Sequence, residues 1–241
     1  MRFAFISDIH GNLYSLELVL SDIQQANVDQ IVCLGDVASL GPQPREVIAR
    51  LRELQIPIIM GNHDNYLLNL HLTENQLPWL RASEAWCQSQ LKRDDLDFLR
   101  SFQPHLSFDL DQNTKMLCYH GSLRSNEEFL YPNTPSKTLD EIFSGQDAKI
   151  LIGGHTHVQM VRPHRTMILI NPGSVGMPFE YPTSGPDLRA IRRAEYAIVE
   201  MTNGNLTFNL HQLPIDFEEM VKPVRASDMP DVDFWLSTWS P

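Results

Sequence analysis

Five short polar motifs between residues 8 and 157 hold the side chains of this sequence that are best suited to binding metal ions. The motifs are Asp8-Ile9-His10-Gly11-Asn12, Gly35-Asp36, Gly61-Asn62-His63-Asp64, His120-Gly121 and Gly153-Gly154-His155-Thr156-His157. Five of the nine histidines fall within them, together with carboxylates and a carboxamide, and no cysteine does. Oxygen and imidazole ligands without thiolates suit a first-row divalent metal of intermediate hardness, such as Mn, Fe, Co, Ni or Zn.

The spacing within the motifs allows pairs of side chains to converge. Asp8 and His10 are separated by one residue, and at a strand end positions i and i+2 point the same way. His155 and His157 have the same spacing after a glycine pair, which permits unusual φ angles and close backbone approach. These two imidazoles can serve one metal each, and the two carboxylate oxygens of Asp36 can bridge both ions.

Charge counting favours catalysis over metal storage. Two divalent ions would leave about two positive charges after Asp8 and Asp36 are counted, enough to stabilise a bridging hydroxide and a phosphoryl group. Such ions lie roughly 3.5–4 Å apart and hold the attacking and leaving oxygens of an in-line displacement. We assign His63 as the general acid for the leaving oxygen, or as a donor to the phosphoryl oxygens. Asp64 either orients His63 or supports the loop.

Composition sets the broad class. A chain of 241 residues that is 42% hydrophobic can bury one substantial core or two small ones, and the absence of linkers and repeats favours a single domain over residues 1–241. Three sparse cysteines, no leader-like N-terminus and no apolar run of about 18 residues indicate a cytoplasmic protein without a membrane partner. The formal net charge of -11 disfavours nucleic acid as the main partner, but not a small phosphorylated substrate.

The elements that must position the motifs begin with a βαβαβ pattern. Residues 2–7, 30–34 and 56–60 are apolar runs typical of strands. The runs between them carry apolar residues at helical spacing, which predicts parallel strands joined by right-handed crossovers. The first three motifs each follow one of these strands directly, and ligands bind outside the carboxyl ends of such strands.

The rest of the chain changes character. Residues 65–103 predict a helical insertion that covers one side of the site, and a helix is expected near 136–143. Short strands are expected over residues 106–110, 116–119, 150–152, 167–170, 196–201 and 206–211. Their close spacing predicts a second sheet with antiparallel members. Residues 176–193 are expected to form a long loop, and a tail over residues 214–241 is expected to contain a short helix near 216–221.

At this point the chain resembles the calcineurin-like metallophosphoesterase superfamily, specifically its small bacterial and archaeal phosphodiesterase branch. The five motifs carry the resemblance together with Asn171-Pro172-Gly173-Ser174-Val175-Gly176, and Arg193-Ala194-Glu195-Tyr196-Ala197 resembles the strand that follows. The resemblance implies a four-layer αββα sandwich of two mixed sheets. It also implies a dinuclear site of the Mn or Fe type, with Ni, Co and Zn also tolerated.

The resemblance further implies roles for individual residues. The first metal would be held by Asp8, His10, Asp36 and His157, and the second by Asp36, Asn62, His120 and His155. Candidate substrate-binding residues are Asn12, Asn171, Gly173 and Ser174, although Asn12 also suits a helix cap and Asn171-Pro172-Gly173 a tight turn. The implied activity is hydrolysis of small phosphodiesters by in-line attack of a metal-bridging hydroxide, with His63 and Asp36 as the catalytic residues.

The sequence differs from the family pattern at two places, and these differences favour some of the family's activities over others. In the family's protein phosphatases the Gly-Asp motif continues to Asp-Arg-Gly, and here Ser39 and Leu40 replace that pair. The sequence therefore lacks, at this position, the arginine that would bind phosphate through two hydrogen bonds. Hydrolysis of phosphoproteins and of dinucleoside polyphosphates is for this reason kept only as an alternative. The arginine that often follows the Gly-x-Pro of the favoured branch is Phe179 here. Candidate substitutes are Arg124, Arg189, Arg192 and Arg193.

Other classes remain as alternatives. A non-catalytic metal-binding scaffold is disfavoured because every expected ligand is present along with His63. A nuclease is disfavoured by the acidic balance and the lack of a basic stripe. Trp235 and Trp239 in the tail either form a dimer contact or fold back on their own domain, so a homo-oligomer stays open.

Overall fold

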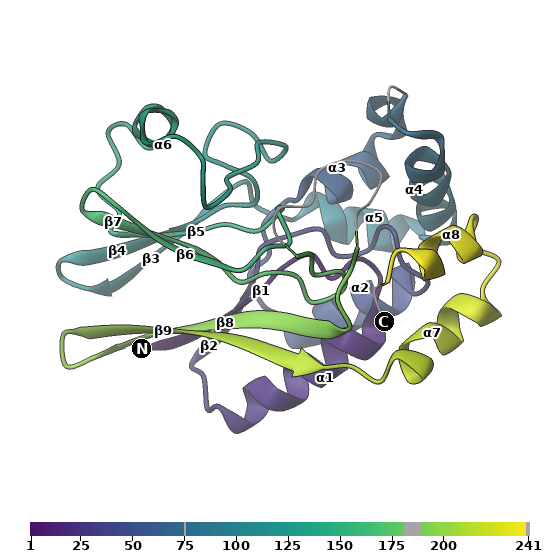
Figure 1. Ribbon diagram of the computed structural model, residues 1–241, viewed down its shortest axis with the longest axis horizontal. Coiled ribbons are helices and arrows are strands. Elements are labelled where there is room, and N and C mark those ends of the chain that lie inside the picture. Colours follow the sequence, from purple (N-terminus) through teal and green to yellow (C-terminus); the bar gives the residue numbers. More distant parts are fainter. Residues whose placement is uncertain (75, 181–188, 240–241) are drawn as a thin grey trace.

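Two mixed β-sheets lie face to face in the computed structural model, which describes residues 1–74, 76–180 and 189–239. The strands of the first sheet are, in spatial order, β2 (Gln30–Cys33), β1 (Arg2–Ile6), β8 (Arg193–Thr202) and β9 (Asn205–Pro214). Those of the second are β3 (Leu106–Asp111), β4 (Thr114–Cys118), β5 (Ile150–Ile152), β7 (Met167–Asn171) and β6 (Met160–His164). Figure 1 shows the second sheet above the first, with α6 (Ser136–Ile142) above the pair and α1 (Leu13–Gln25) below it.

Alternating side chains separate these layers into distinct hydrophobic cores. Phe3 and Phe5 of β1 pack between the sheets against residues such as Met116 and Ile150 of the second sheet. Their neighbours Ala4 and Ile6 belong to the core beneath α1 and α2 (Pro44–Leu54), on the other face of the same sheet. The outer face of the second sheet packs against α6 in a third cluster. The period of two along β1 therefore produces the predicted four-layer αββα sandwich.

Local sequence accounts for the helices that flank the first sheet. The Asn12 side chain caps α1 by accepting a hydrogen bond from the Ser15 amide at 3.1 Å. The buried face of α1 carries Leu16, Val19, Leu20 and Ile23 at helical spacing. Helix α2 begins with Pro44, which suits a first helical position because the missing N–H would have no partner there.

The helices expected over residues 65–103 are present. They are α3 (Asn62–Leu68), the short 3₁₀-helix η1 (Leu70–Thr73), α4 (Pro78–Gln90) and α5 (Arg93–Arg100). Figure 1 shows them grouped on one side of the sandwich, beyond the ends of the strands. The division into one domain over residues 1–241, with an insertion and a tail, stays a prediction.

Three details of the predicted sheets are wrong. Residues 56–60 form only isolated bridges, because Pro57 has no N–H and the Ile59 and Met60 amides donate to different partners, Cys33 and Gln103. Strands β8 and β9 join the first sheet, since β1 pairs with β2 on one edge and leaves the other edge for the long, buried β8. Strand β6 was not expected, and its Pro163 is tolerated because β6 is an edge strand.

The C-terminal tail folds back on its own chain. It contains α7 (Phe217–Ala226) and α8 (Val232–Ser237). Trp235 and Trp239 are buried in a cluster with residues of α7, and the Trp235 indole donates to the Leu40 carbonyl at 2.8 Å. Part of the loop expected over 176–193, residues 181–188, lies outside the described residues. No helix in the described part of the chain has the length and apolar character needed to cross a membrane.

Replacing Phe5 with alanine tests the core between the sheets. Phe5 is fully buried, so Phe5→Ala should lower the free energy of unfolding by about 3–5 kcal/mol through lost burial and the cavity left behind. Urea denaturation measures this change. Leu77→Ala is the control, because Leu77 is 62% exposed and its loss should cost less than about 0.5 kcal/mol. Equal effects of the two substitutions would contradict the layered core.

Candidate metal centre

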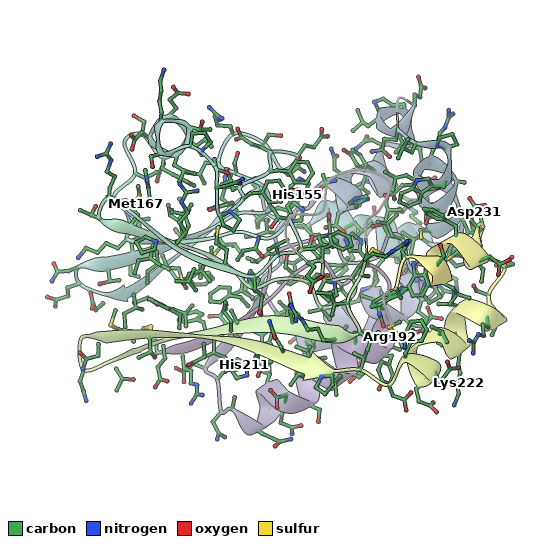
Figure 2. All side chains as sticks on the ribbon, in the orientation of Figure 1. His155, Met167, Arg192, His211, Lys222 and Asp231 are labelled. Carbon is green, nitrogen blue, oxygen red and sulfur yellow. The ribbon has the colours of Figure 1, made fainter. Side chains whose placement is uncertain are left out.

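The five motifs meet at the carboxyl ends of parallel strands from both sheets. Asp8 follows β1, Asp36 follows β2, His120 follows β4 and His155 follows β5, while Asn62 begins α3. Strands β1 and β2 are parallel to each other, as are β4 and β5. Figure 2 shows His155 near the middle of the molecule, where loops from the second sheet approach the helices.

Two groups of buried side chains lie close enough to hold one metal ion each. Asp8, His10 and His157 form the first group, and Asp36, His120 and His155 form the second; the ligand atoms of each group lie within 4.8 Å of one another. In the first group, Asp8 Oδ1 is 3.3 Å from His157 Nε2. In the second, Asp36 Oδ2 is 3.2 Å from His120 Nε2.

Asp36 also lies between the two groups. Its Oδ2 is 4.0 Å from His10 Nε2 of the first group. On the other side, the Asn62 side-chain oxygen lies 3.0 Å from His120 Nε2. The geometry therefore allows the Asp36 carboxylate to contact two ions at once, with Asn62 at the edge of the second group.

Several atoms of these groups are buried without hydrogen-bond partners among the described residues. They are Asp8 Oδ1, Asp36 Oδ2 and His155 Nε2. A buried charged oxygen without a partner is costly unless a cation or a donor compensates it. These atoms include one carboxylate oxygen from each group, so the residues present fit a pair of divalent metal ions.

Four of the candidate ligands, Asp8, Asp36, His10 and His155, are already in the protonation states that metal binding requires. The exception is His120: burial lowers its pKa, but Asp36 outweighs burial and raises it to about 9, so this imidazole must lose a proton when it binds a metal ion. Burial raises the pKa of Asp8, but the His157 and His120 imidazoles together outweigh burial and lower this pKa to about 2. Burial likewise raises the pKa of Asp36, and His120 and His63 outweigh it to hold this pKa well below its usual range. Burial and a neighbouring imidazole lower the pKa of His10 and of His155 to about 3. Near neutral pH these carboxylates are charged and these two imidazoles are neutral.

The backbone brings the ligands together through left-handed turns. Asp8, His10, Asp36, His155 and His157 have φ angles between 48° and 68°. Because β1 ends at Ile6, the expected alternation at a strand end does not orient Asp8 and His10. A left-handed conformation is uncommon for residues with a side chain, and such residues cluster at functional sites.

Hydrogen bonds from the far ring nitrogens orient three of the imidazoles. His120 Nδ1 donates to the Leu34 carbonyl and His157 Nδ1 to the Met177 carbonyl, each at 2.7 Å. His10 Nδ1 lies 3.1 Å from the Ser39 hydroxyl. Each contact turns Nε2 toward the centre, as outer partners of metal-binding histidines commonly do. Ser39, at a position where the sequence departs from the family pattern, thus orients His10.

His63 lies beside the two groups and is paired with a residue that the motifs did not identify. Its ring is edge-on to His10, with 5.2 Å between centroids, and its Nδ1 is hydrogen-bonded to the Glu84 carboxylate of α4. Burial lowers the pKa of His63, but Glu84 and Asp36 outweigh burial and raise it to about 9. The sequence could have identified Glu84, because it shares the apolar face of its helix with Leu80, Cys87 and Leu91. A glutamate on such a face is buried, and a buried glutamate needs a partner.

Asp64 supports the loop and does not orient His63. Its carboxylate accepts hydrogen bonds from the backbone amides of Asp36 at 2.7 Å, Val37 at 2.9 Å and Gly61 at 3.0 Å. These bonds fix the turn that carries Asp36 against the start of α3.

Three of the four candidate substrate-binding residues lie in loops, and the fourth, Asn171, is the last residue of β7. Besides capping α1, Asn12 donates to the Gly176 carbonyl at 3.3 Å. Asn171 donates to the Gly154 carbonyl at 2.7 Å and accepts from the Gly173 amide at 2.8 Å. Ser174 donates to the Asp8 carbonyl at 2.7 Å. All four are buried, and these contacts tie the ligand loops to one another.

A cavity of about 350 Å³ adjoins the second group through His120. Arg124 and His105 also line it, and none of the described residues in its lining is a carboxylate. The Arg124 guanidinium is held by Glu128, whose Oε2 accepts from Nε at 3.1 Å. The other candidate arginines have contacts elsewhere: Arg189 with the Ser237 carbonyl, Arg192 over the Phe217 ring and Arg193 with Glu195.

Comparisons with known proteins agree with this geometry. The sequence model of the calcineurin-like phosphoesterase superfamily domain matches residues 1–204. An uncharacterized protein of Methanocaldococcus jannaschii is 28% identical over 250 residues, which cover 97% of this chain and 94% of that protein. Phosphodiesterase YfcE of Escherichia coli K12 is 26% identical over 188 residues, which cover 74% of this chain and 81% of that protein.

A solved structure supports the same assignment. The crystal structure of a metallophosphoesterase from Sphaerobacter thermophilus matches with a TM-score of 0.74 at 28% sequence identity, covering 99% of each chain. The family match spans most of the sequence and contains every candidate ligand. The chain therefore belongs to the calcineurin-like phosphoesterase superfamily and is a metal-dependent phosphoesterase.

Proposed function

We propose that this protein hydrolyses small phosphodiesters with two divalent metal ions. Asp8, His10, Asp36 and His157 would hold the first ion, and Asp36, Asn62, His120 and His155 the second. The observation that carries the proposal is the pair of buried ligand groups joined at Asp36, each with a carboxylate oxygen that lacks a hydrogen-bond partner among the described residues. Mn or Fe are the ions proposed, and Ni, Co and Zn also suit these ligands.

The residues divide the chemistry between them. When bound, the two ions would supply Lewis-acid activation of the phosphoryl group and a nucleophile derived from water. His63 would donate a proton from Nε2 to the leaving oxygen, because its Nδ1 is already hydrogen-bonded to Glu84. Retention of His63 beside all the candidate ligands supports catalysis over a metal-binding scaffold.

The diester preference rests on the environment of the centre. The Asp-Arg pair of the family's protein phosphatases is replaced by Ser39 and Leu40. Leu40 is buried and its carbonyl accepts from Trp235, so that position offers no cation to a phosphate. The cavity beside His120 is of a size for a small substrate group, and Arg124 in its wall would contact a substrate anion. Similarity to a protein named as a phosphodiesterase supports the same ranking.

The state of the three cysteines bears on the cellular compartment in which the protein acts. Cys33, Cys87 and Cys118 are free and buried. Thiols without disulfides suit a reducing compartment, and we propose that the protein acts in the cytoplasm.

Asp36→Ala tests the bridging role. Removal of the carboxylate shared by the two groups should reduce bound manganese from two equivalents to one or none and abolish hydrolysis of bis-p-nitrophenyl phosphate. Elemental analysis and a colorimetric assay measure the two effects. Asp140→Asn is the control, because Asp140 pairs with Arg165 away from the centre. Two bound equivalents in Asp36→Ala would show that Asp36 does not bridge.

His63→Ala tests proton donation. The variant should keep both metal ions and lower kcat by roughly 10²–10⁴-fold, the usual contribution of a positioned general acid. Elemental analysis must accompany the kinetics. Loss of metal from His63→Ala would instead make His63 part of the metal site and reject its assigned role.

Arg124→Ala tests the proposed substrate contact. A hydrogen bond to a charged group is worth about 1.5–3 kcal/mol, so KM should rise roughly 10–100-fold while metal content stays the same. Arg165→Ala provides the matched control, since Arg165 is an exposed arginine that is also paired with a carboxylate. A KM within twofold of wild type would remove Arg124 from the substrate site.

A further inference from the structure

Glu84 is a buried carboxylate in the helical insertion whose hydrogen-bond partner belongs to the candidate active site. It is 0% exposed, in the middle of α4, and its Oε1 is bonded to His63 Nδ1. Its second oxygen has no hydrogen-bond partner among the described residues. Glutamate is almost never fully buried unless it is paired, so the contact with His63 accounts for a carboxylate at this position.

The His63 side chain is held on several sides and still reaches solvent. Its backbone amide donates to Asp36 Oδ1 at 2.9 Å. The Tyr66 ring contacts it edge to face, with 5.4 Å between centroids. The side chain is 14% exposed and lies edge-on to His10. With Nδ1 bonded to Glu84, Nε2 is the nitrogen left to meet a substrate.

Two polar side chains near His63, Ser39 and Asp64, have other partners and do not accept a hydrogen bond from His63 Nδ1 in place of Glu84. The Ser39 hydroxyl lies against His10, and the Asp64 carboxylate accepts three backbone amides. Glu84 itself sits on a firmly attached helix. On α4, Gln88 donates to the Leu67 carbonyl at 2.6 Å and the Cys87 thiol lies 3.8 Å from the Gly41 carbonyl.

We propose that Glu84 is the positioning residue of His63. Its carboxylate accepts the Nδ1–H and fixes the ring orientation in which the protonated Nε2 faces the substrate. During the reaction Nδ1 keeps its proton against Glu84. The proton given to the leaving oxygen comes from Nε2, while the electron pair of the broken P–O bond stays on that oxygen. The helical insertion is then part of the catalytic apparatus, and this inference rests on the proposed function of the site.

Kinetics of Glu84→Ala and Glu84→Gln in the manganese-loaded enzyme test the proposal. Glu84→Ala should lower kcat about 10–100-fold, the range that a hydrogen bond to a charged partner supports, with KM and metal content unchanged. Glu84→Gln should recover part of the loss, because its amide oxygen can accept the same Nδ1–H. Asp95→Ala is the matched control, since Asp95 is a buried carboxylate of the insertion that pairs with Arg52 at 3.2 Å. Its kcat should equal that of wild type.

A double variant separates positioning from a general structural effect. If Glu84 acts only through His63, His63→Ala/Glu84→Ala should be no slower than His63→Ala alone. The proposal is overturned if Glu84→Ala keeps kcat within twofold of wild type, or if the two losses multiply in the double variant.

A spectroscopic measurement tests the contact without relying on turnover. In the zinc-loaded protein with ¹⁵N-labelled histidine, His63 should carry a proton on each ring nitrogen, with a downfield Nδ1 proton. Glu84→Ala should lose that signature, and Asp95→Ala should keep it. An unchanged His63 spectrum in Glu84→Ala would overturn the inference. If wild type hydrolyses no diester but Glu84→Ala still alters His63, the proposed function fails while the contact stands.

Discussion

Burial of two carboxylates, Asp8 and Asp36, without enough hydrogen-bond donors is the constraint on which this structure depends. One oxygen of each is satisfied by a backbone amide: His155 donates to Asp8 Oδ2 at 3.0 Å and His63 to Asp36 Oδ1 at 2.9 Å. The remaining oxygens face imidazoles across the centre. A buried charge is tolerated only when it is paired, so this arrangement of acceptors around a small space calls for cations.

The same constraint explains the backbone of the ligand loops. Left-handed turns at the ligands let loops from two sheets approach closely, and glycines make that approach sterically feasible. A Cβ on Gly61 would lie 2.0 Å from Asp36 Oδ1, and one on Gly154 would lie 2.0 Å from the Ser7 hydroxyl. Interlocking backbone bonds, such as Asp8 N–H to the Gly35 carbonyl at 3.0 Å, hold the turns. Strain at the site is thus offset by the rigid sandwich behind it.

Sequence reasoning predicted the elements whose signals are local. The apolar period of α1, its Asn12 cap and the motifs after β1 and β2 each lie within a short segment. Strand partners were harder, because nothing within residues 193–214 reveals that β8 pairs with β1 rather than with the second sheet. The convergence of Asp8 and His10 was expected from strand alternation, whereas it arises from left-handed turns that tertiary contacts stabilise. Glu84 belongs to no motif, and its contact with His63 becomes apparent only in the folded structure, where α4 packs against His63.

The central claim is that Asp36 joins two cations in one buried centre. Anomalous diffraction from crystals grown with manganese tests this claim most directly. The account predicts two peaks roughly 3.5–4 Å apart, with Asp36 between them, His10 and His157 beside one and His120 and His155 beside the other. A single peak, or two peaks that do not share Asp36, would contradict it.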